Sequence, residues 1–359
     1  RRGQVSPSLP RPDARLMKKL LNTLFVSTQG AYVFHEGESV VIRIEKEERL
    51  RVPIHHLGGL VCFGDVAVSS PLLGLCGERG VHVSLLSERG RFRARVHTEV
   101  SGNVLLRRQQ YRVADDPAAR LEIARGFVLG KMANARTLLQ RAARDHGEKG
   151  GGGELERAVL HLAALIDAAR RETSVDSLRG LEGDASRTYF EVLDHAITAQ
   201  KDAFFMRGRS RRPPLDNFNA LLSFIYTWLV HDAEAALESV GLDPQVGFLH
   251  TERPGRPSLA LDLVEEFRPF FADRLALSLV NLKQSRANGF TTSESGGVVM
   301  TDDTRKELLV AYQKRKQEEI QHPFLEEALA TGLLIHAQAL LLARHIRGDL
   351  DAYPPFIWK

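Results

Sequence analysis

Apolar residues change their spacing once along the chain, and that change divides the sequence into two parts. Between residues 20 and 100, short runs of β-branched residues are broken by Gly, Ser and Asn, and residues 91–96 alternate Arg with apolar side chains. This pattern is typical of strands, with residues 70–76 as one short helix between two of them. From residue 104 on, apolar residues recur three and four positions apart, as they do in helices. The predicted fold class is α+β and multi-domain: a small N-terminal all-β domain, built as a sandwich or folded-over sheet, and then a larger all-α domain.

A length of 359 residues is too large for one compact core, which agrees with two domains. We predict a β domain at residues 17–103 and a helical domain at residues 104–359. Residues 1–16, rich in Pro, Arg and Ser, are predicted to be a linker. Because the chain begins without Met and Met17 opens an apolar run, the sequence favours the downstream half of a fusion. Helices are expected at residues 120–144, 154–172, 184–203, 218–240, 258–279, 301–321 and 323–347.

Composition narrows the class of protein only slightly. The formal net charge of +4 permits an anionic partner without requiring one. Cys62 and Cys76 lie in apolar surroundings, which predicts buried thiols in a reducing compartment rather than a disulfide framework. No run of about 18 apolar residues and no signal peptide are visible in the sequence. We therefore predict a cytoplasmic protein without a membrane segment.

The segment at residues 247–269, GFLHTERPGRPSLALDLVEEFRP, concentrates residues that can bind a cation. His250 precedes a Pro/Gly/Arg turn, and a helix is expected to open near Ser258. At about 100° per residue, Asp262, Glu265 and Glu266 share one face of that helix. Carboxylates with one imidazole are typical ligands of a hard divalent cation. A solvated acidic helix face beside an unrelated histidine explains this segment equally well.

Glu182 is a candidate third ligand from a distant part of the chain. It precedes Gly183 and Asp184, where we expect a helix to begin. A carboxylate at a helix start is favoured by the macrodipole, and this structural role explains Glu182 by itself. In the functional interpretation, the tertiary fold brings it beside His250 and Glu265.

Basic residues around these acids are candidates for binding the phosphates of a polyanion. Four arginines lie within six residues in a Pro-rich segment that contains no acid, and each guanidinium can engage phosphate bidentately. A solvated basic loop is the alternative. The candidate DNA-binding residues are Arg207, Arg209, Arg211, Arg212, Arg253, Arg256, Lys283 and Arg286.

Taken together, these features resemble the CRISPR-associated adaptation integrase, member one of the Cas family. The resemblance covers nearly the whole chain from Met17 and rests on four features. These are the β-then-α layout, the Leu-Glu-Gly at residues 181–183, the arginine loop before the Asn-Ala-Leu-Leu at residues 219–222, and the motif at residues 247–269.

The resemblance implies a metal-dependent DNA integrase that inserts new spacers into a CRISPR array. By the family pattern, Glu182, His250 and Glu265 match the metal ligands, and Asp262 matches a neighbouring acidic catalytic position. Glu266 is one further acid, whereas the acid three residues after the aspartate is the one expected to bind metal. The implied metal is Mg²⁺ or Mn²⁺, which suits two carboxylates and one imidazole with open positions.

The family resemblance also implies partners. The β domain would serve dimerisation and partner contacts, and homodimers would be bridged by a small ferredoxin-like protein on double-stranded DNA, both prespacer and repeat. An iron–sulfur nuclease would be fused upstream, although no four-cysteine set lies in this chain.

The expected reaction is transesterification, in which the 3′-hydroxyl of a captured fragment attacks a phosphodiester at the edge of a repeat. A metal-dependent endonuclease would use water on the same residues. A non-catalytic DNA-binding scaffold is the second alternative, and it requires no metal.

Overall fold

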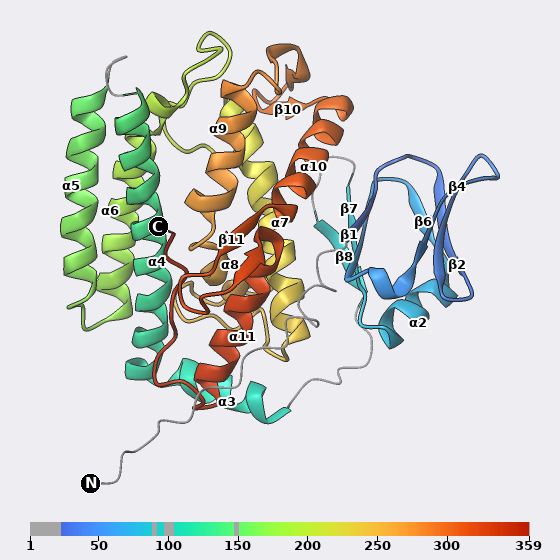
Figure 1. Ribbon diagram of the computed structural model, residues 1–359, viewed down its shortest axis with the longest axis horizontal. Coiled ribbons are helices and arrows are strands. Elements are labelled where there is room, and N and C mark those ends of the chain that lie inside the picture. Colours follow the sequence, from blue (N-terminus) through green and yellow to red (C-terminus); the bar gives the residue numbers. More distant parts are fainter. Residues whose placement is uncertain (1–22, 88–91, 97–103, 147–150, 359) are drawn as a thin grey trace.

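The structure is a computed structural model that describes residues 23–87, 92–96, 104–146 and 151–358 (Figure 1). The strands of the first part lie to one side of a larger body of helices, so the predicted α+β class, with a β domain followed by a helical domain, is confirmed. The predicted linker at residues 1–16 lies outside the described residues, and so does most of the joint between the two parts. No helix in the described ranges is long and apolar enough to cross a membrane.

The N-terminal part consists of two four-stranded sheets with a short helix. One sheet has the order β1-β5-β7-β8, with β8 antiparallel to three parallel strands, and the other has the order β4-β3-β2-β6. Ser69 accepts a hydrogen bond from the Leu72 amide, which caps the helix, and Pro71 occupies its first turn. The elements are β1 (Thr23–Val26), β2 (Ala31–Glu36), β3 (Ser39–Ile44), β4 (Glu47–Pro53), η2 (Ile54–His56), β5 (Gly59–Phe63), β6 (Val66–Val68), α2 (Ser70–Glu78), β7 (His82–Leu86) and β8 (Phe92–Val96).

The helical part is arranged around α4 (Pro117–His146), a helix of 30 residues. Helices α5 and α6 pack along one side of α4, and the segment that carries the acidic motif packs against the other (Figure 1). The remaining elements are α3 (Val104–Asp115), α5 (Gly152–Ala169), α6 (Val175–Val192), η4 (Leu193–Ala196), α7 (Asn217–Ser239), α8 (Ser258–Val264), η5 (Arg268–Asp273), α9 (Arg274–Asn281), η6 (Ala287–Gly289), β9 (Phe290–Thr292), β10 (Val298–Met300), α10 (Asp302–Gln317), β11 (Glu319–Gln321), β12 (Ala328–Ala330), η7 (Thr331–Leu333) and α11 (Leu334–Ile346).

The prediction of an all-α second domain was wrong in two places, where short hairpins pair β9 with β10 and β11 with β12. The second hairpin replaces the predicted start of a helix at residue 323. Pro323 cannot donate a backbone hydrogen bond, and the His322 side chain accepts from the amides of Phe324 and Leu325. These contacts close a turn, so the helix begins only at Leu334.

The helix predicted at residues 258–279 is three shorter segments. Helix α8 ends at Val264, a π-helical segment follows at Arg268–Asp273, and α9 continues from Arg274. Pro269 explains the interruption because it has no amide hydrogen to donate to the carbonyl of residue 265. Single π-helical turns are frequent at functional sites.

The C-terminal residues fold back into the helical body instead of projecting from it. Phe356 is fully buried, and its ring stacks on Phe267 with centroids 5.3 Å apart. The Asn134 side chain of α4 donates to the Phe356 carbonyl and accepts from the Trp358 amide. The aromatic C-terminal tail therefore packs against α4 and η5.

Candidate active site

Glu182 lies in the middle of α6, because this helix begins at Val175 under a Ser174 cap. The prediction that Glu182 stands at a helix start was wrong, since Gly180 and Gly183 are accommodated within the helix. The macrodipole of a helix terminus therefore does not account for this carboxylate. Its Oε1 atom accepts hydrogen bonds from Ser186 Oγ at 2.9 Å and from Lys131 Nζ.

Asp262 is fully buried and orients His250. Its Oδ2 atom accepts from the Phe248 and Leu249 amides, and its Oδ1 atom lies 2.9 Å from the His250 amide and 2.6 Å from His250 Nδ1. A carboxylate that accepts from Nδ1–H leaves the lone pair of Nε2 free, which is how metal-binding histidines are commonly held. Asp262 is saturated by these contacts, so we assign it as a positioning residue.

Glycine is required where the His250 loop approaches α8. A Cβ atom on Gly247 would lie 2.8 Å from Ser258 and 2.9 Å from Asp262 Oδ2. Any larger residue would push the loop away from the carboxylate that anchors it. The glycine at the start of the motif therefore sets the position of His250.

Glu265 is the buried acid that faces His250, with its side chain 2% exposed and Oε1 3.9 Å from His250 Nε2. Its Oε1 atom also lies 2.9 Å from Arg268 Nη1, and its Oε2 atom lies 2.7 Å from Lys131 Nζ. Burial raises the pKa of Glu265, but Arg268, Lys131 and His250 outweigh it and lower the pKa to about 2. Glu265 is therefore ionised at neutral pH.

The three predicted ligands are linked through two contacts: the Lys131 ammonium lies against both Glu182 and Glu265, and Glu265 faces His250. Within the described ranges, no three His, Cys, Asp or Glu side chains converge closely enough to hold a metal ion together. The donors nevertheless suit a hard cation. Glu265 Oε2 is buried without a hydrogen bond of acceptable geometry, although Lys131 lies close to it. Glu265 Oε2, His250 Nε2 and the Glu182 carboxylate are donors of the chemical type that Mg²⁺ or Mn²⁺ accepts.

Glu266, predicted to share a face with Asp262 and Glu265, points in another direction. It is fully buried and accepts hydrogen bonds from Tyr353 Oη, the Phe356 amide and Gln338 Nε2. The single-face prediction was wrong because α8 ends at Val264 and its periodicity does not continue to residue 266. Burial raises the pKa of Glu266 to about 8 against these hydrogen bonds, so this acid anchors the tail in its neutral form.

Glu266 is expected to make stability fall as pH rises. Its folded pKa of about 8 lies above the unfolded value near 4.5, so its contribution is complete below about pH 4.5 and is lost progressively up to about pH 8. The slope approaches about 1.4 kcal/mol per pH unit. Urea unfolding of Glu266→Gln, which cannot ionise, should therefore lose this slope, and wild type should lose stability relative to the variant between pH 5 and pH 8. Parallel stability curves for the two proteins would contradict this assignment.

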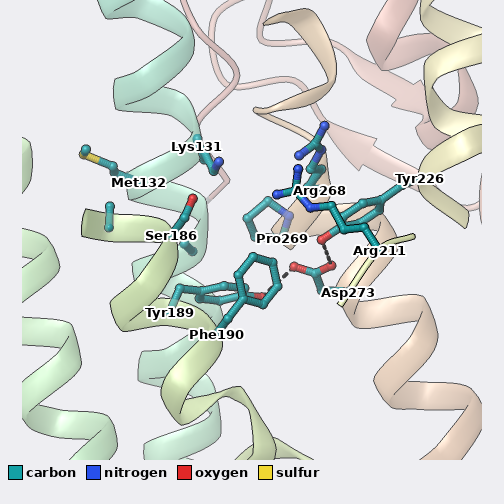
Figure 2. A pocket seen from close by; sticks show the side chains of 12 residues that line it. Lys131, Met132, Ser186, Tyr189, Phe190, Arg211, Tyr226, Arg268, Pro269 and Asp273 are labelled. Carbon is teal, nitrogen blue, oxygen red and sulfur yellow. Dashed lines mark hydrogen bonds between the residues drawn. The ribbon is translucent and has the colours of Figure 1, made fainter. Parts of the chain in front are cut away.

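Beside the acids lies a pocket between α4, α6, α7 and η5 (Figure 2). Lys131 and Ser186 stand on one side of it, and Arg211 and Arg268 on the other. The fully buried Asp273 lines the pocket as well.

Asp273 accepts hydrogen bonds from Tyr189 Oη at 2.7 Å and Tyr226 Oη at 2.6 Å. Burial raises the pKa of Asp273 to about 6, although both hydrogen bonds act to lower it. This contact ties α6 and α7 to the end of η5. Sequence reasoning missed Lys131 and Asp273, because neither belongs to a motif.

One arginine of the arginine loop is held by hydrogen bonds within the protein, and the other three are exposed. Arg209 donates to Asn219 Oδ1 and Ser223 Oγ, so its predicted role as a free phosphate ligand is better explained as anchoring this loop on α7. Arg211 is exposed and lines the pocket beside the acids. Arg207 and Arg212 are exposed as well.

The other predicted basic residues lie at two different distances from the acids. Arg253 and Arg256 belong to the loop between His250 and α8. Burial and the nearby Arg253 lower the pKa of Arg256, which places two guanidinium groups close together there. Lys283 and Arg286 instead follow the C-terminal end of α9 (Arg274–Asn281) and do not line the pocket beside the acids.

Comparisons with known proteins identify the family of this chain, which combines a two-sheet β domain, a helical domain and an acid–histidine site. The chain belongs to the CRISPR associated protein Cas1 family, whose model matches residues 24–314. It is 56% identical over 343 residues to "CRISPR-associated endonuclease Cas1 1" of Chlorobaculum tepidum, covering 96% of this chain and 100% of that protein. It is also 36% identical to a "CRISPR-associated exonuclease Cas4/endonuclease Cas1 fusion" of Geobacter sulfurreducens, covering 94% of this chain and 60% of that protein.

Solved structures share the fold at lower sequence identity. A "Casposase bound to integration product" superposes with a TM-score of 0.79 at 20% identity, covering 94% of each chain. A "Cas6-RT-Cas1--Cas2 complex" chain superposes with a TM-score of 0.79 at 22% identity, covering 94% of this chain and 36% of that one. At this identity, the likeness establishes the fold alone.

Proposed function

We propose that this protein is a metal-dependent DNA integrase that joins captured double-stranded DNA to a CRISPR repeat. The observation that carries the proposal is the orientation of His250 by Asp262, which leaves Nε2 facing the buried Glu265, an acid that shares the Lys131 ammonium with Glu182. Membership of the Cas1 family supports it, and so does the fold shared with a casposase bound to integration product.

Glu182, His250 and Glu265 would hold the cation, for which we propose Mg²⁺ or Mn²⁺. When bound, such a cation polarises a phosphoryl oxygen and stabilises negative charge on it. Asp262 keeps the proton on His250 Nδ1, so that Nε2 stays available as a donor. Arg211 and Arg253, both exposed near this centre, are proposed to bind the phosphate backbone without reading bases. Arg207, Arg212 and Arg256 extend the same basic surface.

The proposed reaction exchanges one phosphodiester bond for another. The 3′-oxygen of the captured fragment forms a bond to the repeat phosphorus as it loses its proton, and the bond from phosphorus to the 3′-oxygen of the repeat strand breaks. The leaving oxygen takes up a proton and becomes a new 3′-hydroxyl. One diester is formed for each one broken, so the reaction needs no external energy source.

The test compares two labelled duplex fragments that differ only at the 3′-terminus. A fragment with a 3′-hydroxyl should be joined to a repeat-bearing plasmid in the presence of Mg²⁺ or Mn²⁺, and a 3′-deoxy fragment should not. EDTA should abolish joining by the first fragment. Equal labelling of the plasmid by both fragments would overturn the proposal, because it would show that no 3′-oxygen is transferred.

A metal-dependent endonuclease is the second candidate, favoured by the name of the Chlorobaculum relative. In that reaction, water replaces the 3′-hydroxyl on the same residues. The plasmid product distinguishes hydrolysis from transesterification, because hydrolysis yields nicked or linear plasmid without label. A non-catalytic scaffold would yield neither product and would show no dependence on metal.

The partners are proposals of the same kind. The structural neighbour that is a Cas6-RT-Cas1--Cas2 complex supports Cas2 as a partner, and we propose that this small protein bridges two homodimers. The Geobacter relative supports an upstream nuclease fusion. Cys62 and Cys76 are buried and free, as expected in a reducing compartment, so the cytoplasm stays our prediction.

A further inference from the structure

Lys131 contributes the positive charge that lies between the two acids of the candidate metal centre. It extends from α4, and its side chain is 12% exposed. Its ammonium group donates to Glu182 Oε1 and lies 2.7 Å from Glu265 Oε2. Glu182 belongs to α6 and Glu265 directly follows α8, and the lysine contacts both carboxylates.

A divalent cation and this ammonium group compete for the same oxygens. Mg²⁺ binds oxygen at about 2.0–2.1 Å and tolerates little departure from octahedral geometry, so the carboxylates must close around it. The ammonium contacts one oxygen of each acid and thereby fills the space between them. Both cations cannot occupy this position together.

The charges around the site show how its net charge changes when a divalent cation takes the place of the Lys131 ammonium. Glu182, Glu265 and Asp262 carry three negative charges, and Lys131 and Arg268 carry two positive charges. With His250 neutral, the metal-free site has one net negative charge. A divalent cation changes this to one net positive charge, and one phosphodiester then restores neutrality.

We propose that Lys131 is the internal counter-ion of the metal-free site, which the divalent cation displaces from Glu182 and Glu265. Lys131 lines the same pocket as Arg211 and Arg268, so a DNA phosphate bound there can accept the hydrogen bonds of the displaced ammonium (Figure 2). Metal and DNA then favour each other's binding, because the phosphate stabilises the lysine in its displaced position. By linkage, the two effects on binding affinity are equal. The inference rests on the proposed metal site.

The test measures Mn²⁺ affinity of the full chain without DNA, by calorimetry and by the electron paramagnetic resonance signal of free Mn²⁺. Lys131→Met keeps the length of the side chain and removes its charge. It is expected to bind Mn²⁺ at least about tenfold more tightly than wild type, since a competing charge within about 4 Å is gone. Lys131→Arg keeps the charge and should not gain affinity. Lys306→Met, a charge-matched control on the exposed side of α10, should bind as wild type does.

A second measurement separates this role from a general loss of packing. In EDTA, Lys131→Met should melt at a lower temperature than wild type, because Glu182 and Glu265 repel each other without the lysine. Added Mn²⁺ should then raise its melting temperature by more than it raises that of wild type. A short duplex should tighten Mn²⁺ binding to wild type by more than it does for the variant.

Two outcomes are distinguishable failures. If wild type binds Mn²⁺ through His250 but Lys131→Met binds it equally or more weakly, the counter-ion proposal is overturned and the metal site stands. If wild type binds no Mn²⁺, or if His250→Ala binds it unchanged, the proposed metal site itself fails, and the inference fails with it.

Discussion

Replacing Glu265 with glutamine is expected to lower strand joining by about a thousandfold. The change keeps the shape of the side chain but removes a charge that we propose as a metal ligand, and a bound cation contributes several kcal/mol to phosphoryl chemistry. The measurement is the initial rate of joining a labelled 3′-hydroxyl fragment to a repeat plasmid at saturating Mn²⁺. Glu182→Gln, at a position whose side chain is 24% exposed, should give a similar loss with less risk to folding.

The neighbouring glutamate supplies the matched control. Glu266 is as deeply buried as Glu265, but it contacts the C-terminal tail instead of Lys131 and Arg268. Glu266→Gln should retain joining within about threefold while changing the pH dependence of stability. If the two substitutions reduce joining equally, Glu265 has no special role in the chemistry.

Replacing Phe356 with alanine is expected to destabilise the helical part by about 3–5 kcal/mol, the usual range for Phe→Ala in a core. The ring is fully buried and contacts Phe267 and Phe270. The Phe356 amide donates a hydrogen bond to Glu266, so losing the ring weakens this contact as well. Urea unfolding followed by far-UV circular dichroism measures the change.

Ile357 provides the comparison one residue along the chain. It is 38% exposed, whereas both of its neighbours are buried. Ile357→Ala should therefore change stability by no more than about 0.5 kcal/mol. An equal effect of the two substitutions would mean that the tail does not dock as the structure has it.

The sequence could predict the strands and helices whose positions follow from the spacing of nearby apolar residues. The strands before residue 97 and most helices after residue 104 follow their apolar spacing. The helix at residues 258–279 did not, because Pro269 breaks a pattern whose apolar positions continue on both sides. The hairpin around Pro323 was missed for a similar reason, since the His322 side chain closes that turn.

The candidate site was predictable where residues lie close in sequence or match a family motif. Glu182, His250 and Glu265 are predictions of the second kind, and in the structure they are linked through Lys131 and Glu265. The direction of Glu266 could not be predicted, because it depends on contacts with residue 356. Lys131 could not be predicted either, since a single lysine in an amphipathic helix ordinarily faces solvent.

The docked tail has a consequence for synthesis on the ribosome. Glu265 and Arg268 lie close in sequence to Glu266, and Glu266 accepts hydrogen bonds from Tyr353 and Phe356 in the tail. The chain must therefore be synthesised as far as Trp358, and those residues must leave the exit tunnel, before the acids reach their final positions. A nascent chain that is halted before Tyr353 lacks these contacts of Glu266, although its β domain has already had time to fold.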